Sequence, residues 1–284
     1  MAKEPLEAQA ELVNEPFQYV KYKITYRSLD GVKIRAYLAK PYETEGKTSR
    51  KFPAIITAPG YRGDGWGLEL GESLRGYVIL HVCPRSQGES AQLWKIDGPD
   101  YLTWHIANPE GYFYQGAYVD LVRGVDYLCS RPDVDTNRIG AIGISQGGGL
   151  VLAAAALDPR IKAVVARVPF LCDMRLAATI DNSLVKVLLD RYGALTPGNL
   201  NTLDYFDPVN LAHRLQAPTL IGAGGKDTTC PAQTVRAVFD KLAGIKVLAI
   251  YPNMDHPSGS DSHATEAFYE MGWDWMERYL KRIQ

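Results

Sequence analysis

The sequence lacks several features that would assign it to a specialised class of protein. Its 31 basic and 32 acidic residues leave a formal charge of −1, so there is no basic excess to bind nucleic acid or an anionic membrane. Its four cysteines are scattered and form no CxxC pair, which argues against a zinc site and against a disulfide scaffold. We therefore expect buried thiols, no metal and no other cofactor.

Long apolar runs are also missing. The longest mostly apolar stretch, residues 147–157, is far shorter than the roughly 20 residues that span a bilayer. No charged and then apolar signal segment opens the chain. These absences predict a cytoplasmic protein that is soluble and has no membrane partner.

The chain also has no internal repeat and no linker rich in Ser, Gly or Pro. With 46% hydrophobic and 22% charged residues, its composition is typical of a globular domain. We predict one domain over residues 1–284. Within it, residues 1–16 are polar and are expected to form a helix or an arm on the surface of the body.

Hydrophobic patterning predicts an α/β fold with a mostly parallel sheet and helices on both faces. An antiparallel hairpin leads the sheet, with strands at 19–26 and 32–39. Apolar runs typical of buried parallel strands follow at 54–58, 77–82, 139–144, 163–168, 219–222 and 247–251. Helices are expected at 116–129, 148–157, 232–242 and 264–283.

Residues 172–213 have a mixed helical pattern that a simple strand–helix repeat does not require. We predict a helical insertion over the carboxyl ends of the strands. Ligands bind at that edge in open parallel sheets, so the insertion is expected to cover an active site.

A G-x-S-x-G motif spans residues 143–147, between the expected strand 139–144 and the expected helix 148–157. This context is typical of a nucleophile elbow, a strained turn that exposes a serine. Gly143 and Gly147 lie where side chains would collide with neighbouring elements. We predict Ser145 as a catalytic nucleophile; the alternative is a glycine-rich turn packed against a helix.

A serine hydroxyl needs a base and an orienting carboxylate, which in this architecture follow in the order Ser, Asp/Glu, His. Asp227 lies in the loop after the expected strand 219–222, and His256 in the loop after 247–251. Asp255 adjoins His256, but neighbours in sequence rarely face each other across a triad. We predict His256 as the base and Asp227 as its partner, against the alternative of a surface-loop histidine.

Acyl transfer also needs backbone donors that stabilise an oxyanion. The N–H of Gln146, directly after the serine, is one candidate. Tyr61, in a Pro-Gly-Tyr turn after the expected strand 54–58, fits the second position. Arg85 and Gln87, which follow the strand 77–82, are candidates to support the elbow by hydrogen bonds, and a solvated loop is an equal alternative for them.

Several segments together resemble the acetyl xylan esterase and cephalosporin C deacetylase family, carbohydrate esterase family seven, of the α/β-hydrolase superfamily. They include GISQGGG at 143–149, YVDLVRGVDYL at 118–128, LDYFDPVNLAHRLQAPTL at 203–220 and KDTTCPAQT at 226–234. The likeness runs from about Phe17 to the last helix. It implies an α/β-hydrolase fold in which Ser145, Asp227 and His256 form the triad and the Tyr61 amide serves the oxyanion.

The same resemblance implies a serine esterase that removes acetyl groups from small acetylated sugars and related alcohols without a metal. It also implies a homo-oligomer, often a hexamer whose active sites face an internal cavity. Ser86 stands where the family has a glycine, and residues 91–111 are shorter than the family's usual interface insertion. Pro257 follows His256 where the family usually has glutamate, and proline restricts the residue before it, so we expect a different path for this loop.

Other functions stay open on the sequence alone. A prolyl-oligopeptidase-type peptidase or a general carboxylesterase uses the same triad on the same fold, although this sequence has no propeller-length N-terminal segment. Dienelactone hydrolase chemistry uses a cysteine where this chain has Ser145. A non-catalytic binding protein on a hydrolase fold is the alternative from a different class.

Overall fold

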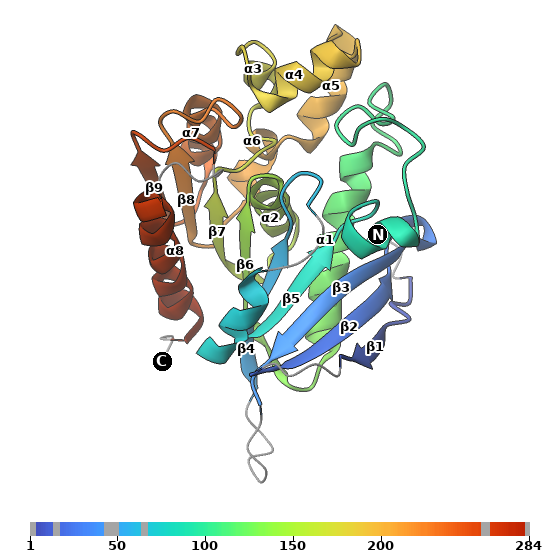
Figure 1. Cartoon of the computed structure of the whole chain (residues 1–284), viewed down its shortest axis with the longest axis vertical. Coiled ribbons are helices and arrows are strands. Elements are labelled where there is room, and N and C mark those ends of the chain that lie inside the picture. The colour runs from blue at the N-terminus through green and yellow to red at the C-terminus, as the bar shows by residue number, and fades with distance from the viewer. Residues whose placement is uncertain (1–3, 14–17, 43–50, 64–67, 257–261, 282–284) are drawn as a thin grey trace.

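The computed structural model describes residues 4–13, 18–42, 51–63, 68–256 and 262–281. These residues form one nine-stranded sheet in the order β1-β2-β3-β5-β4-β6-β7-β8-β9 (Figure 1). Its strands are β1 (Gln9–Leu12), β2 (Val20–Arg27), β3 (Lys33–Lys40), β4 (Phe52–Ala58), β5 (Val78–Cys83), β6 (Val134–Ile144), β7 (Ile161–Arg167), β8 (Thr219–Gly224) and β9 (Lys246–Tyr251).

The sheet is mostly parallel and has antiparallel lead strands, as predicted. Strands β1, β2 and β3 pair antiparallel, β3 pairs antiparallel with β5, and β4 to β9 are parallel. The β2–β3 turn contains Asp30 and Gly31 with φ of 61° and 70°, a conformation that glycine and aspartate tolerate best. Every residue of β5 and of β8 is buried, which is why these strands appear in the sequence as apolar runs.

Helices cover both faces of the sheet, and the sheet separates the two large apolar cores. On one face lie α1 (Phe113–Ser130), α2 (Gln146–Leu157) and α7 (Ala232–Lys241); on the other lie α8 (Ser262–Met276) and a 3₁₀ segment (Leu68–Arg75). A π-helical turn, Glu277–Lys281, continues α8. No helix within the described residues is long and apolar enough to cross a membrane.

Residues 172–213 fold into short helices, as predicted for the insertion. They are α3 (Met174–Ala177), α4 (Leu184–Arg191), α5 (Pro197–Phe206) and α6 (Pro208–Leu211), followed by a 3₁₀ turn (Ala212–Arg214). In Figure 1, α3 to α5 lie at the top of the molecule, above the ends of β6 and β7. The Leu184 N–H donates to the Thr229 carbonyl at 3.0 Å, so the insertion contacts the loop that carries Asp227.

Most element boundaries shift by a few residues from those predicted, and two differences are larger. Strand β6 begins at Val134 rather than at 139. Residues 135–138 are polar and none of them is buried, so the hydrophobic pattern did not reveal this part of the strand. Within the segment 1–16, the described residues contain the edge strand β1 rather than a helix. All four β1 residues are exposed, so this strand is defined by its backbone pairing with β2.

Candidate active site

Ser145 occupies the turn between β6 and α2 with φ 52° and ψ −120°. A residue other than glycine rarely adopts such dihedrals, which are strained. The turn is held by the backbone: the Ser145 N–H donates to the Arg167 carbonyl at 2.9 Å, and the Ser145 carbonyl accepts from the Phe170 N–H at 2.8 Å. The nucleophile candidate is therefore fixed by β7 and the loop after it.

The two motif glycines pack too closely against backbone to carry a side chain. A Cβ at Gly143 would lie 2.2 Å from the Gly147 carbonyl oxygen, and a Cβ at Gly147 would lie 2.2 Å from the Ala58 carbonyl oxygen. Backbone atoms cannot rotate away as a flexible side chain can. These contacts explain the glycine spacing of the motif and bring the end of β4 against the first turn of α2.

Ser145, His256 and Asp227 form one hydrogen-bonded line. Ser145 Oγ lies 3.0 Å from His256 Nε2, and His256 Nδ1 lies 2.8 Å from Asp227 Oδ2. The Asp227 side chain is 0% exposed, and its other oxygen accepts from the Cys230 N–H at 2.8 Å. Asp227 Oδ2 accepts a hydrogen bond from His256 Nδ1–H, which selects the tautomer in which Nε2 is the acceptor for the serine hydroxyl.

Cys230 was expected only to be buried, and it also contacts the triad. Its N–H donates to Asp227 Oδ1, and burial raises the pKa of its thiol well above the ordinary value. The donor atoms of Asp227, Cys230 and His256 all lie within 4.8 Å of one another. A carboxylate, a thiol and an imidazole are types of donor that bind transition metals. The one local signal for this arrangement was the position of Cys230 three residues after Asp227.

The two predicted oxyanion donors lie on neighbouring elements. Gln146 is the first residue of α2, where a helix N–H has no intrahelical acceptor and the helix dipole favours negative charge. Tyr61 lies in the turn after β4, which the close contact at Gly147 brings against that end of α2. Among the described residues, none accepts a hydrogen bond from the Tyr61 N–H.

The Tyr61 side chain anchors its turn to the segment 91–111. Its hydroxyl donates to Asp100 Oδ1 at 2.5 Å, and Arg62 Nη2 donates to Asp100 Oδ2 at 2.8 Å. Burial and the Asp100 carboxylate raise the pKa of Tyr61 far above its ordinary value. Sequence reasoning missed Asp100, because no local pattern connects it with Tyr61.

Arg85 and Gln87 are both buried, so the alternative of a solvated loop was wrong. Gln87 Oε1 accepts from Gln146 Nε2 at 2.9 Å, a direct contact with the residue after the nucleophile. Arg85 pairs instead with the buried Asp120, at 2.9 Å between Nη2 and Oδ1. Arg85 therefore holds the position of its loop, while Gln87 contacts the elbow.

Ser86, between Arg85 and Gln87, stands where the family pattern has a glycine. Ser86 has φ 64°, a left-handed conformation that glycine adopts without strain. Its hydroxyl accepts from the Ile96 N–H at 3.1 Å, and its carbonyl accepts from the Tyr101 hydroxyl at 2.9 Å. The other departure, Pro257, lies outside the described residues.

The comparisons with known proteins agree on one family. The family model described as acetyl xylan esterase matches residues 1–273. The acetyl esterase Axe7A of Xylanibacter ruminicola is 34% identical over 264 residues, which are 87% of this chain and 56% of that protein. The chain thus spans about half the length of this curated relative.

Two solved structures agree with the chain over nearly its whole length. The acetyl xylan esterase from Paenibacillus sp. R4 is 32% identical with a TM-score of 0.85, and covers 98% of this chain and 90% of its own. Acetyl xylan esterase 1 from Thermoanaerobacterium sp. JW/SL YS485 is 25% identical with a TM-score of 0.86, and covers 98% and 89%. Peptidases of known structure share the α/β-hydrolase fold at 19% identity or less. The chain belongs to the acetyl xylan esterase family.

Proposed function

We propose that this chain is a serine esterase that hydrolyses acetyl and other short-chain esters of small acetylated sugars or related alcohols. The observation that carries the proposal is the line from Ser145 Oγ through His256 to Asp227, with spacings of 3.0 and 2.8 Å. These are hydrogen-bond distances for a nucleophile, its base and the group that orients the base. Membership of the acetyl xylan esterase family supports acetyl esters as the substrate class.

In the proposed mechanism, His256 Nε2 takes the Ser145 proton as Oγ attacks the ester carbonyl carbon. The negative charge on the carbonyl oxygen is stabilised by the N–H groups of Gln146 and Tyr61. Protonated His256, stabilised by Asp227, then gives its proton to the departing alcohol, which leaves an acetyl ester on Ser145. A water molecule, deprotonated by the same imidazole, releases acetate and restores the serine.

The direct test is hydrolysis of p-nitrophenyl acetate by the wild-type protein and by Ser145→Ala, with a chelator present. We expect the variant to lose about 10⁴-fold or more in kcat, as triad nucleophiles do. Ser130→Ala, at the exposed end of α1, is the matched control and is expected to retain full activity. Activity retained by Ser145→Ala would refute the assignment, and activity lost to the chelator would refute metal independence.

Acyl-chain preference separates this proposal from a general carboxylesterase. We expect acetate esters to turn over faster than butyrate or octanoate esters, and peptide substrates not to be cleaved. The peptidases that share the fold are less than 25% identical to this chain, so their activity does not indicate peptide cleavage here. Faster hydrolysis of octanoate esters, or of an acylated peptide, would replace the proposal by one of these alternatives.

The finer assignments are also proposals. We propose cephalosporin C as a second acetylated substrate, a homo-oligomer as the working form, and the cytoplasm as its location. One domain over residues 1–284, with the insertion 172–213 above the triad, is the proposed unit of activity. Sedimentation that gives a monomer would refute the oligomer, and a lack of acetate release from cephalosporin C would refute the second substrate.

A further inference from the structure

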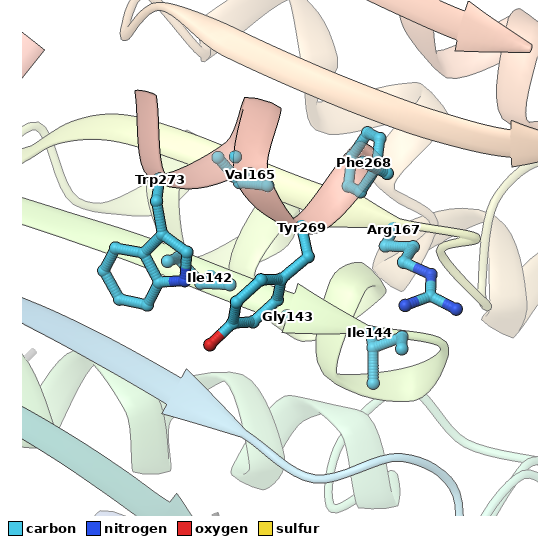
Figure 2. A pocket seen from close by; sticks show the side chains of 9 residues that line it. Ile142, Gly143, Ile144, Val165, Arg167, Phe268, Tyr269 and Trp273 are labelled. Carbon is cyan, nitrogen blue, oxygen red and sulfur yellow. The ribbon is translucent and has the colours of Figure 1, made fainter. Parts of the chain in front are cut away.

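A cavity lies on the face of the sheet that α8 covers. It has a volume of about 60 Å³, enough for a few waters or one small organic molecule. Its lining includes the apolar residues Ile142, Ile144, Val165, Phe268 and Trp273 and a single cation, Arg167. Figure 2 shows Arg167 near one end of this cavity and Trp273 near the other.

Arg167 is incompletely satisfied in this apolar setting. Its Nη2 donates to Thr265 Oγ1 at 2.9 Å, and its buried Nε has no hydrogen-bond partner within the described part of the chain. Burial lowers the pKa of Arg167, and the smaller opposing effect comes from the Tyr251 hydroxyl rather than from a carboxylate. A buried donor without an acceptor is costly, so Nε of this half-buried side chain gains from an anion or a polar acceptor that enters the cavity.

The surroundings of Arg167 select the chemistry of that anion. A guanidinium presents parallel N–H groups that match the two oxygens of a carboxylate. One cation among apolar side chains neutralises a single negative charge, whereas a doubly charged phosphate or sulfate would keep an unpaired charge in a poorly solvated site. The apolar wall beside Arg167 suits a short hydrocarbon tail.

We propose that this cavity, which we call the Arg167 pocket, binds a short monocarboxylate with its oxygens on Arg167 and its methyl group against the apolar lining. Acetate is the first choice, and that choice rests on the proposed function, because acetate is the acid which the proposed reaction releases. The pocket is distinct from the triad, but it adjoins it: Arg167 is the residue whose carbonyl accepts the Ser145 N–H at 2.9 Å.

The test is a titration with sodium acetate followed by the NMR signals of ¹³C-labelled methyl groups. We expect saturable shifts of the Ile142, Ile144 and Val165 methyl signals with a Kd on the order of millimolar, as suits so small a ligand. Sodium butyrate is expected to give the same pattern, and sodium sulfate at equal ionic strength none. No turnover is measured, so this experiment and the proposed function can fail independently.

Variants assign the shifts to Arg167. We expect Arg167→Met to weaken acetate binding at least tenfold and Arg167→Lys, which keeps the charge but not the planar fork, to weaken it less. Arg236→Met removes an exposed arginine from α7 and is expected to leave binding unchanged. Wild-type methyl signals that do not respond, equal shifts with sulfate, or equal acetate affinity in Arg167→Met would each overturn the proposal, and the first two need no variant to fold.

Discussion

Replacing Gly147 by alanine tests whether the close contact between α2 and β4 sets the catalytic geometry. The added Cβ would lie 2.2 Å from the Ala58 carbonyl oxygen and 3.2 Å from the Pro59 carbonyl oxygen. Since ordinary contacts of this kind begin near 3.4 Å, the first turn of α2 and the end of β4 must separate by about 1 Å. That movement carries Gln146 away from the turn that holds Tyr61.

Two opposing effects determine the stability of Gly147→Ala. Overpacking against rigid neighbours costs about 1–3 kcal/mol, while alanine is favoured over glycine in a helix by about 1 kcal/mol. We expect a net loss of up to about 2 kcal/mol in the free energy of unfolding. Because an error of about 1 Å in a catalytic site costs about 10²-fold, we expect kcat for p-nitrophenyl acetate to fall by about that factor.

Gly198→Ala is the matched control, because it makes the same chemical change in another helix, α5. An added Cβ there meets no atom within 4 Å, so we expect unchanged kcat and equal or slightly higher stability. Urea unfolding and steady-state kinetics on both variants separate the two effects. If Gly147→Ala kept kcat within threefold of wild type, the link between this contact and the oxyanion donors would be refuted.

Substitutions at three further residues test other parts of the site and its support. Asp227→Asn keeps the size of the side chain but orients the wrong imidazole tautomer, so kcat should fall about 10⁴-fold, as in other triads; a loss below tenfold would exclude Asp227 from the triad. Arg85→Ala leaves the fully buried Asp120 without its cation, and urea unfolding should show a loss of about 3–5 kcal/mol. Asp207→Ala removes the acceptor of the Asp173, Met174 and Val209 N–H groups. At about 1 kcal/mol or more for each unmet donor, the free energy of unfolding should fall by about 3 kcal/mol or more. Asp207→Asn keeps one side-chain oxygen and should lower it less.

The central strands could be predicted from the sequence because burial on both faces leaves them almost no polar residues. Strand β4 is buried at six of its seven positions, so its apolar run marks it clearly. The start of β6 is different: near Val134 it pairs only with Phe52, and the register shifts before the regular pairing that begins with Ile139 and Ala54. Polar residues on this irregular stretch hide it from any hydrophobic pattern.

The sequence could bring Ser145, Asp227 and His256 to one candidate site because loop order is a property of the chain. The contacts around these residues could not be predicted. Asp100 lies 39 residues from Tyr61 in sequence, and Asp120 lies 35 residues from Arg85. Each pair forms only when the segment 91–111 and α1 pack beside the loops after β4 and β5. Neither hydrophobic periodicity nor motif spacing contains that information.

The position of Ser145 depends more on backbone than on side chains. Arg167 and Phe170 hold Ser145 through their main-chain groups, and Gly147 contributes by having no side chain at all. A backbone acceptor leaves the side chain of its residue unconstrained, so position 167 can carry an arginine that faces a separate pocket while its carbonyl supports the elbow. Among the residues that determine the geometry of Ser145, only the glycines can therefore be identified from the sequence. Arg167 belongs to both proposed sites: its carbonyl supports Ser145, and its side chain faces the proposed carboxylate site.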